Sequence, residues 1–101
     1  MTQPISEAAR TLGERIRARR LRLSCSQEEI ALLAGMNVSN YGKIERGIGN
    51  PNFHTIILIA SVLTIDPGKL LAGINGSDLP QRKQAFTAAD FVRERARHAQ
   101  G

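Results

Sequence analysis

The chain has few aromatic residues and only one cysteine. Its 101 residues include no tryptophan, three phenylalanines and one tyrosine, so a hydrophobic core must be built mainly from aliphatic side chains. Cys25 has no partner for an internal disulfide, which favours a reducing cytoplasm and a small buried hydrophobe rather than a reactive thiol. No apolar run approaches the about 18 residues of a membrane span, and no apolar signal segment opens the chain. We therefore expect a cytoplasmic protein without a membrane partner.

Familiar catalytic and metal-binding motifs are also missing. His54 and His98 lie far apart, and neither stands at a metal-binding spacing from Cys25. The sequence contains no G-x-S-x-G, no phosphate-binding P-loop and no H-E-x-x-H. Glu28 and Glu29 are adjacent and diverge on a helix, which argues against an acid/base pair. We expect no metal, no cofactor and no enzyme activity.

Basic residues outnumber acidic ones. Lys and Arg total 14 against nine Asp and Glu, and the formal net charge is +5. Six of the basic residues fall between Arg10 and Arg22. A net positive charge of this size is typical of proteins that bind a polyanion such as nucleic acid, although a surface that only keeps the protein soluble gives the same composition.

The hydrophobic pattern predicts an all-α chain. Apolar residues recur at helical spacing, and no strand pattern appears. The expected helices cover about 7–21, 27–34, 38–45, 53–63 and 67–72. Ser26 and Glu29 form a capping box for the second helix, and Asp66 with Pro67 opens the fifth. The predicted apolar face of the fourth helix is Phe53, Ile56, Ile57, Ala60 and Leu63.

The pattern also predicts how the chain is divided. Residues 1–74 form one compact domain, and residues 75–84 read as a linker because Gly, Ser, Pro and charge replace the apolar period. An extra C-terminal helix then occupies 85–101, where Thr87 and Asp90 make a weaker capping box.

Residues 27–47, QEEIALLAGMNVSNYGKIERG, contain the strongest functional signal. Two short helical patterns flank Gly35, which stands where a tight turn needs positive φ. Ala31 is small where two helices must approach closely, and Asn37 can cap the second helix. This arrangement is typical of a helix-turn-helix unit, which lays its second helix in the DNA major groove.

On a wider scale, residues 12–72 resemble the Cro/C1-type helix-turn-helix family, the XRE family of bacterial and phage regulators. The resemblance rests on five pieces in the family's order and spacing: SQEEIA at 26–31, AGM at 34–36, KIERG at 43–47, the NP loop with its apolar helix, and DPGKLL at 66–71. It implies a compact five-helix lambda-repressor-like domain that binds operator DNA, commonly as a dimer.

The resemblance also implies which residues contact DNA. The base-reading positions are Val38, Ser39 and Lys43, with Asn40 beside them at the groove wall. Val38 suits a thymine methyl group, Ser39 can donate or accept, and Lys43 suits guanine O6 and N7. Contact with phosphate alone is the alternative for Lys43. The residues implied for phosphate contact and positioning are Gln27, Asn37, Tyr41 and Arg46, with the amides of the 47–50 loop.

An ion pair between Arg20 and Glu45 is implied as well, and it would fix the angle of the recognition helix without reading bases. Gly42 departs from the family pattern, because glycine inside a helix costs about 1 kcal/mol relative to alanine. Close approach of the backbone to DNA would explain it. Tyr41 stands where the family has an aliphatic residue, so we expect its ring in the core and its hydroxyl at the surface or on a phosphate. The Gln27 amide is expected near the first recognition residue.

For assembly, the resemblance favours a homodimer on an operator with inverted half-sites. The primary contact is expected around the fifth helix, at Ile65, Leu70, Leu71 and Ile74. The C-terminal helix, with Phe86, Phe91 and Val92, is expected to pack across it or onto the partner; a frayed tail that adds DNA affinity is the alternative. A protein-interaction module, such as an antitoxin that neutralises a toxin or a bridging coactivator, also stays open. Among regulators, a phage-type repressor and a restriction-modification controller both fit.

Overall fold

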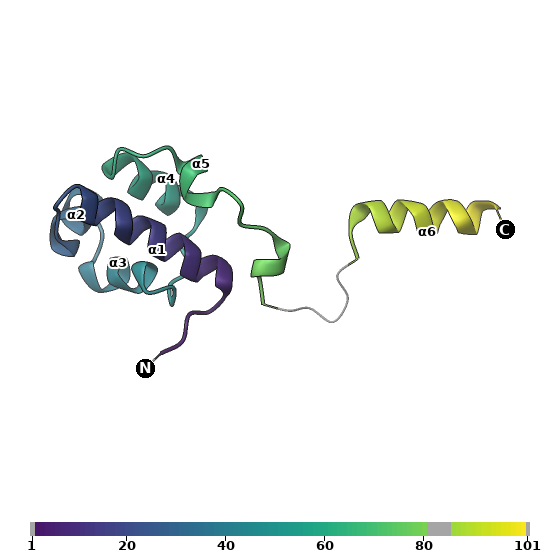
Figure 1. Ribbon diagram of the computed structural model, residues 1–101, viewed down its shortest axis with the longest axis horizontal. Coiled ribbons are helices and arrows are strands. Elements are labelled where there is room, and N and C mark those ends of the chain that lie inside the picture. Colours follow the sequence, from purple (N-terminus) through teal and green to yellow (C-terminus); the bar gives the residue numbers. More distant parts are fainter. Residues whose placement is uncertain (1, 81–85, 101) are drawn as a thin grey trace.

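The computed structural model describes residues 2–80 and 86–100, and every regular element in these residues is helical, as predicted. Figure 1 shows α1–α5 packed as one body, with α6 at the other end of the molecule. The elements are α1 (Glu7–Arg22), α2 (Gln27–Leu33), α3 (Val38–Glu45), α4 (Phe53–Val62), α5 (Pro67–Leu71), the 3-10 turn η1 (Gly76–Asp78) and α6 (Ala88–Gln100). The last four positions of the expected linker, 81–84, lie outside the described residues.

Side-chain caps set the helix starts. Ser26 accepts from the Glu29 amide and Glu29 accepts from the Ser26 amide, so the predicted capping box is present. Asp66 caps α5, and Pro67 occupies its first position. The Thr87–Asp90 capping box opens α6 in the same reciprocal way. The bounds of α1–α5 lie within one residue of the predicted ranges, whereas α6 begins at Ala88, three residues after its predicted start.

The core of the domain is aliphatic apart from one tyrosine. Cys25 is half-buried against this core, as expected of a small hydrophobe. The buried cluster consists of Leu12, Ile16, Ile30, Ala31, Tyr41, Ile44, Ile59, Ala60, Leu63 and Leu70.

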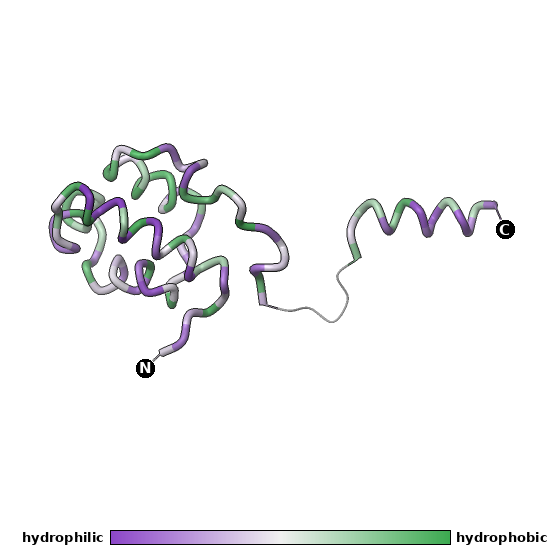
Figure 2. The backbone as a smooth tube through the Cα atoms, in the orientation of Figure 1, coloured by the Kyte–Doolittle hydropathy of each residue, from purple (hydrophilic) through white to green (hydrophobic). Residues whose placement is uncertain are grey.

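The predicted buried face of α4 is partly wrong. Phe53 is 70% exposed and Ile57 is also exposed, whereas Ile59, which the pattern left out, is fully buried. Figure 2 shows why, since nearly the whole length of α4 is hydrophobic. A helix that is apolar on most sides does not reveal which side its neighbours cover. Here contact with α2 and α5 selects the side that carries Ile59 and Ala60.

Helices α1 and α3 approach each other closely at Gly13. A Cβ atom at this position would lie 2.4 Å from the carbonyl oxygens of both Ile44 and Glu45. Only a residue without a side chain permits this separation. The contact fixes the C-terminal end of α3 against α1.

Two arginines of α1 hold the other end of the domain together. Arg15 donates to the carbonyl oxygens of Leu70 and Ala72, and Arg19 donates to those of Leu63 and Thr64. These carbonyls belong to the ends of α4 and α5, which have no helical partner of their own. The two guanidinium groups therefore cap both helices and tie them to α1.

Candidate nucleic-acid interface

The turn between α2 and α3 has the geometry that the sequence predicts. Gly35 adopts φ +64°, in the left-handed region that favours glycine. The Met36 amide donates to the Ala31 carbonyl at 2.8 Å, which closes the end of α2. Asn37 then caps α3, because its Oδ1 accepts from the amides of Ser39 and Asn40 at 2.8 and 3.2 Å. The start of α3 is thus fixed by local hydrogen bonds.

The residues of α3 divide cleanly between a buried and an exposed side. Tyr41, Gly42, Ile44 and Glu45 are buried. The implied base-reading residues Val38, Ser39, Asn40 and Lys43 are all exposed, and so is Arg46 just after the helix. The helix therefore presents one polar and basic stripe to the outside.

The implied ion pair holds the buried side of α3. Arg20 Nε lies 2.7 Å from Glu45 Oε2, and Arg20 Nη2 lies 2.9 Å from Glu45 Oε1. The side chains are 10% and 1% exposed, so the bidentate pair is largely shielded from water. Arg20 Nη1 also donates to the Cys25 carbonyl at 2.9 Å. The pair joins α1, the start of α2 and the end of α3.

Gln27 extends this network to the start of α2. Its Nε2 donates to Glu45 Oε1 at 3.0 Å, so its amide contacts the end of α3 rather than the first recognition residue expected from the resemblance. Burial by itself would raise the pKa of the Glu45 carboxyl, but the hydrogen bonds from Arg20 and Gln27 prevail and hold that pKa below its ordinary value. Glu45 is therefore ionised in the folded protein at neutral pH.

Tyr41 does not have the implied phosphate role. Its side chain is fully buried, and its hydroxyl lies among core atoms without a hydrogen bond of good geometry in the described residues. Burial raises the pKa of this hydroxyl far above its ordinary value, and the nearby Glu45 carboxylate adds to the shift. The ring lies in the core, as expected, but the hydroxyl is enclosed there and reaches neither the surface nor a phosphate outside.

We expect Tyr41→Phe to leave the fold intact and to raise the free energy of unfolding by about 1 kcal/mol, because it removes a buried hydroxyl that gains little from its neighbours. Urea unfolding followed by circular dichroism measures this. A loss of more than about 1 kcal/mol would mean that the hydroxyl makes a stabilising bond to the Arg20–Glu45 pair.

Gly42 lies beneath two long, flexible side chains. The residue is buried, and a Cβ atom there would lie 3.0 Å from Arg46 Nη1 and 3.4 Å from Gln27 Oε1. The missing side chain leaves room for the Arg46 guanidinium to lie across the helix toward Gln27. The two implied phosphate-binding side chains are thus neighbours on one surface.

The backbone amides of the 47–50 loop are mostly engaged within the protein. The Gly47 amide donates to the Ile44 carbonyl, and the amides of Ile48 and Gly49 both donate to the Lys43 carbonyl. These bonds close the end of α3 in place of the implied phosphate clamp. Arg46, directly before this loop, is exposed.

The run of basic residues in α1 is largely structural. Arg10 forms ion pairs with Glu7 and Glu14 on the same helix. Arg15 and Arg19 bind helix carbonyls, and Arg20 binds Glu45, so four of the six arginines between positions 10 and 22 have partners inside the domain. Net charge alone would have placed a nucleic-acid surface here, whereas three of the six arginines join α1 to other elements and a fourth pairs within α1.

The residues implied for dimerisation fall into two groups. Leu70 is fully buried in the core of its own chain, so its implied place in a dimer contact is wrong. Ile65 and Ile74 are half-buried, and Leu71 is exposed beside them. Phe91 and Val92 on α6 are 59% and 49% exposed. Leu70 fits the same apolar period as its neighbours, and periodicity could not distinguish the inward side of this short helix.

Sequence reasoning missed Gly13, which lets α3 approach α1 closely, and it missed Arg15 and Arg19, which tie α1 to the ends of α4 and α5. A glycine in the middle of a strongly helical segment was the available signal for Gly13. The carbonyl partners of the two arginines lie 44 to 57 positions away in the chain, and no local pattern announces them.

Two further kinds of feature are absent from the described residues. No group of three or more His, Cys, Asp and Glu side chains is placed to hold a metal ion within 2–80 and 86–100. In the same part of the chain, no helix is long and apolar enough to cross a membrane.

The helix-turn-helix family profile matches residues 16–70, more than half of the chain. This protein belongs to the Cro/C1-type helix-turn-helix family. It is a DNA-binding transcriptional regulator of the XRE type, and the proteins it resembles are regulators and not enzymes. Comparison with curated proteins gives no match.

Solved structures agree with this assignment. The restriction-modification controller protein C.AhdI from Aeromonas hydrophila is 35% identical with a TM-score of 0.60, and the match covers 61% of this chain and 94% of that one. The P22 c2 repressor, solved with a synthetic operator, is 32% identical with a TM-score of 0.58 over the same shares. The clp gene regulator ClgR from C. glutamicum shares the fold, with 19% identity, a TM-score of 0.63, and 73% and 96% of the two chains covered.

Proposed function

We propose that this regulator inserts α3 into the major groove of an operator and reads bases with Val38, Ser39 and Lys43, with Asn40 at the groove wall. The observation that carries the proposal is the division of α3 into a clamped buried side and an exposed polar side. A helix whose inner side is held by an ion pair keeps a fixed angle, and its outer side chains then meet base edges in one register. The proposed DNA-binding domain is residues 1–74, and α6 is a separate element after the linker.

Phosphate contacts complete the proposed interface. Arg46 and Gln27 lie side by side over Gly42, next to the base-reading stripe. The side-chain oxygen of Asn37 caps α3. In the proposed complex, the side-chain nitrogen of Asn37 therefore donates to the phosphate. Such contacts fix the register on the duplex but carry no sequence information.

We expect Lys43→Ala and Ser39→Ala to relax specificity at one or two base positions, because each removes a group aimed at base edges. The loss is about 1–3 kcal/mol for each good contact on the selected sequence. Selection of bound sequences from a random DNA pool, followed by titration on the winning and on a scrambled duplex, measures it. If Lys43→Ala weakened binding to both duplexes equally, Lys43 would be a phosphate contact.

We expect Arg46→Ala to weaken binding to every sequence and to make the salt dependence shallower, by roughly one released counterion. Arg17→Ala is a matched control, since Arg17 is exposed on α1. Titrations at several salt concentrations give the slope. An unchanged slope for Arg46→Ala would remove Arg46 from the phosphate contacts.

The proposed regulator acts as a homodimer. One helix-turn-helix reads only a few base pairs, and a two-fold dimer places two recognition helices about 34 Å apart on inverted half-sites. Leu70 is buried in its own chain, but three neighbours on the α5 side of the domain are accessible to a partner: Ile65, Leu71 and Ile74. The stoichiometry on the selected duplex tests the dimer, and a single inverted-repeat site bound by one chain would contradict it.

A further inference from the structure

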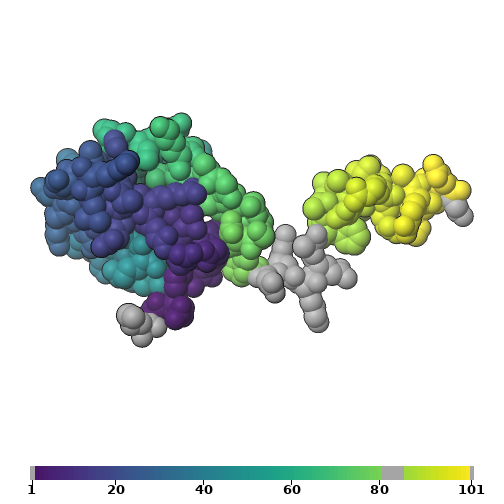
Figure 3. All heavy atoms as spheres, in the orientation of Figure 1, coloured from purple at the N-terminus to yellow at the C-terminus, as the bar shows by residue number. Residues whose placement is uncertain are grey.

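A basic groove lies between α1 and α5. It has a volume of about 560 Å³. Figure 3 shows the atoms of α1 and of the segment after α4 side by side, and the groove runs along their boundary. Four cations and one carboxylate line it: Arg15, Arg19, Arg22, Lys69 and Asp66. A cleft lined mainly by one sign of charge concentrates the field of that charge, so this groove attracts anions.

Two of the four cations are held in place by the fold. Arg15 donates through Nη1 to carbonyl oxygens at the end of α5, and Arg19 donates through Nε and Nη2 to those at the end of α4. A guanidinium has five N–H donors, so each side chain keeps donors that these carbonyls do not use. Arg22 and Lys69 are exposed and form no ion pair with any described residue. A ligand would therefore meet two cations that are already ordered, which lowers the entropy cost of binding.

The groove and the recognition helix lie on opposite sides of α1. Gly13 and Arg20 make contacts of α1 with α3. Arg22 follows Gly13 by nine residues, which is about two and a half helical turns, so it points away from α3. A duplex held against the exposed side of α3, as proposed above, would leave the groove open. The cations of the groove are therefore available to a partner other than that duplex.

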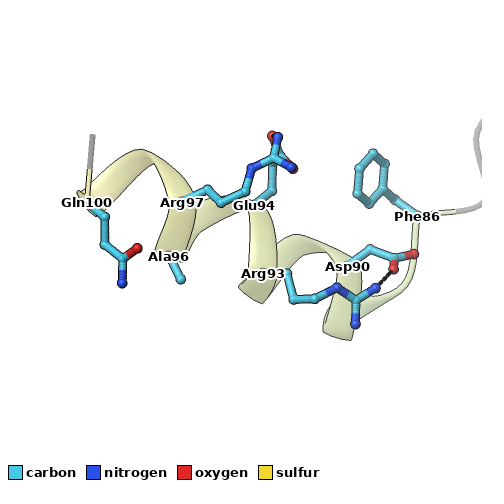
Figure 4. Close-up of a pocket in the computed structure, with 7 residues that line it drawn as sticks. All are labelled: Phe86, Asp90, Arg93, Glu94, Ala96, Arg97 and Gln100. Carbon is cyan, nitrogen blue, oxygen red and sulfur yellow. Dashed lines mark hydrogen bonds and ion pairs between the residues drawn. The ribbon is translucent and has the colours of Figure 1, made fainter.

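Helix α6 is not the acidic partner of this groove. It has three arginines and two carboxylates. Figure 4 shows Arg93 bonded to Asp90, and Arg97 lies 2.9 Å from Glu94, so both carboxylates are already paired. The hollow drawn there is lined by Phe86 and side chains of α6, and it is the surface of one helix.

A second copy of the chain fits the groove poorly as well. A two-fold contact through the groove would place its four cations against the same four of the other copy, and like charges repel. The carboxylates of Glu7 and Glu14 on α1 are already paired with Arg10. The homodimer proposed above is therefore expected to use the side of α5 with Leu71 and Ile74 and to leave the groove uncovered.

We propose that the groove between α1 and α5 binds an acidic segment of a different protein. Arg15 and Arg22 are seven residues apart, about 10 Å along the helix, and a single phosphate group is too small to contact both. Carboxylates on alternate residues of an extended chain lie about 7 Å apart on one side, so a row of them matches the spread of the cations. Their bonds to the guanidinium groups are charge-assisted. Ala18 and Ile65 add apolar surface for a side chain between the carboxylates.

Fluorescence anisotropy of a labelled peptide tests the groove without DNA, so its outcome is separate from that of operator binding. The probe is a short peptide that alternates Glu with Leu, and the matched peptide has Gln in place of every Glu. At physiological ionic strength, where exposed charges beyond about 8 Å are screened, we expect the Glu peptide to bind the full chain. The Gln peptide is expected to bind about ten-fold or more weakly. Equal binding of the two peptides, or none by the Glu peptide at millimolar concentration, would overturn the proposal.

Two double variants locate the bound peptide. Arg22→Gln with Lys69→Gln removes two exposed cations of the groove, and we expect it to weaken binding of the Glu peptide about five-fold or more. Lys43→Gln with Arg46→Gln is the matched control, since it removes the same charge from the exposed side of α3. We expect it to weaken binding less than about two-fold, because its charges lie across the domain and are screened. Circular dichroism checks that both variants fold.

The control pair also identifies the wrong explanations. Equal weakening by both pairs would show that the peptide responds only to net charge, and would overturn the proposal. A larger loss in the control pair would place the peptide on the surface proposed for DNA, which would overturn it as well.

Two further measurements separate the other occupants. Inorganic tripolyphosphate is expected to compete no better than the Glu peptide itself; displacement at about a tenth of the peptide's concentration or less would show a compact phosphate site instead. Sedimentation is expected to give the same number of chains per particle with and without the peptide. Fewer chains per particle with peptide bound would place the groove in the contact between two copies and overturn the proposal.

Discussion

Glu45→Ala is expected to lower the free energy of unfolding by about 3–5 kcal/mol. The substitution strands the Arg20 guanidinium in a largely buried position and removes the acceptor of the Gln27 amide. For a domain of this size such a loss is a large part of the total stability. Urea unfolding at neutral pH measures it, with Arg17→Ala on the exposed side of α1 as a control that changes stability by less than about 0.5 kcal/mol.

The pH dependence gives an independent check of the same pair. The folded protein holds the pKa of Glu45 below its ordinary value. The stability that comes from this shift is therefore fully present above about pH 4.3, the ordinary pKa of glutamate, and is lost as the pH falls through the lowered value. Glu45→Ala is expected to flatten this acid limb. A double-mutant cycle with Arg20→Ala that showed no coupling would refute the pair as a stabilising contact.

Gly13→Ala is the second substitution with a large expected effect. The new Cβ atom would meet two backbone carbonyl oxygens of α3 at 2.4 Å, and backbone cannot turn aside as a flexible side chain can. Overpacking of this kind costs about 1–3 kcal/mol or more, and it exceeds the about 1 kcal/mol that alanine gains over glycine in a helix. Because α3 must shift away from α1, operator affinity is expected to fall as well.

Gly76→Ala is the matched control for that experiment. No atom lies within 4 Å of a Cβ built at Gly76, and its φ is not positive. Thermal and urea unfolding of the two variants under one set of conditions separate a clash from a general effect of replacing glycine. A Gly13→Ala protein as stable as the wild type would mean that α1 and α3 are farther apart than described.

The parts of the fold that sequence predicts well are those fixed by local chemistry. Ser26 with Glu29, Gly35 and Asp66 with Pro67 each act within a few residues, and each stands where its type of residue was expected to act. The Arg20–Glu45 pair was implied by the family resemblance and not by the local pattern. Its partners are 25 positions apart.

The failures concern which side of an apolar element faces inward. Helices α4 and α5 carry apolar residues on more than one side. The hydrophobic pattern therefore does not show which of Phe53, Ile59 and Leu70 face inward. Only the neighbouring helices decide between the sides, and that information is not local. The same holds for Arg15 and Arg19, whose charge suggested a polyanion until their carbonyl partners were located.

In α3, the residues that stabilise the fold differ from those proposed to read DNA, and this affects how such regulators diverge. Stability depends on Tyr41, Ile44 and Glu45, which face inward, whereas the proposed reading of DNA depends on Ser39 and Lys43, which face outward. Exchanging the outward residues leaves the core and the ion pair untouched. A duplicated copy of this gene could therefore acquire a new target sequence through a few surface substitutions, without first passing through an unfolded intermediate.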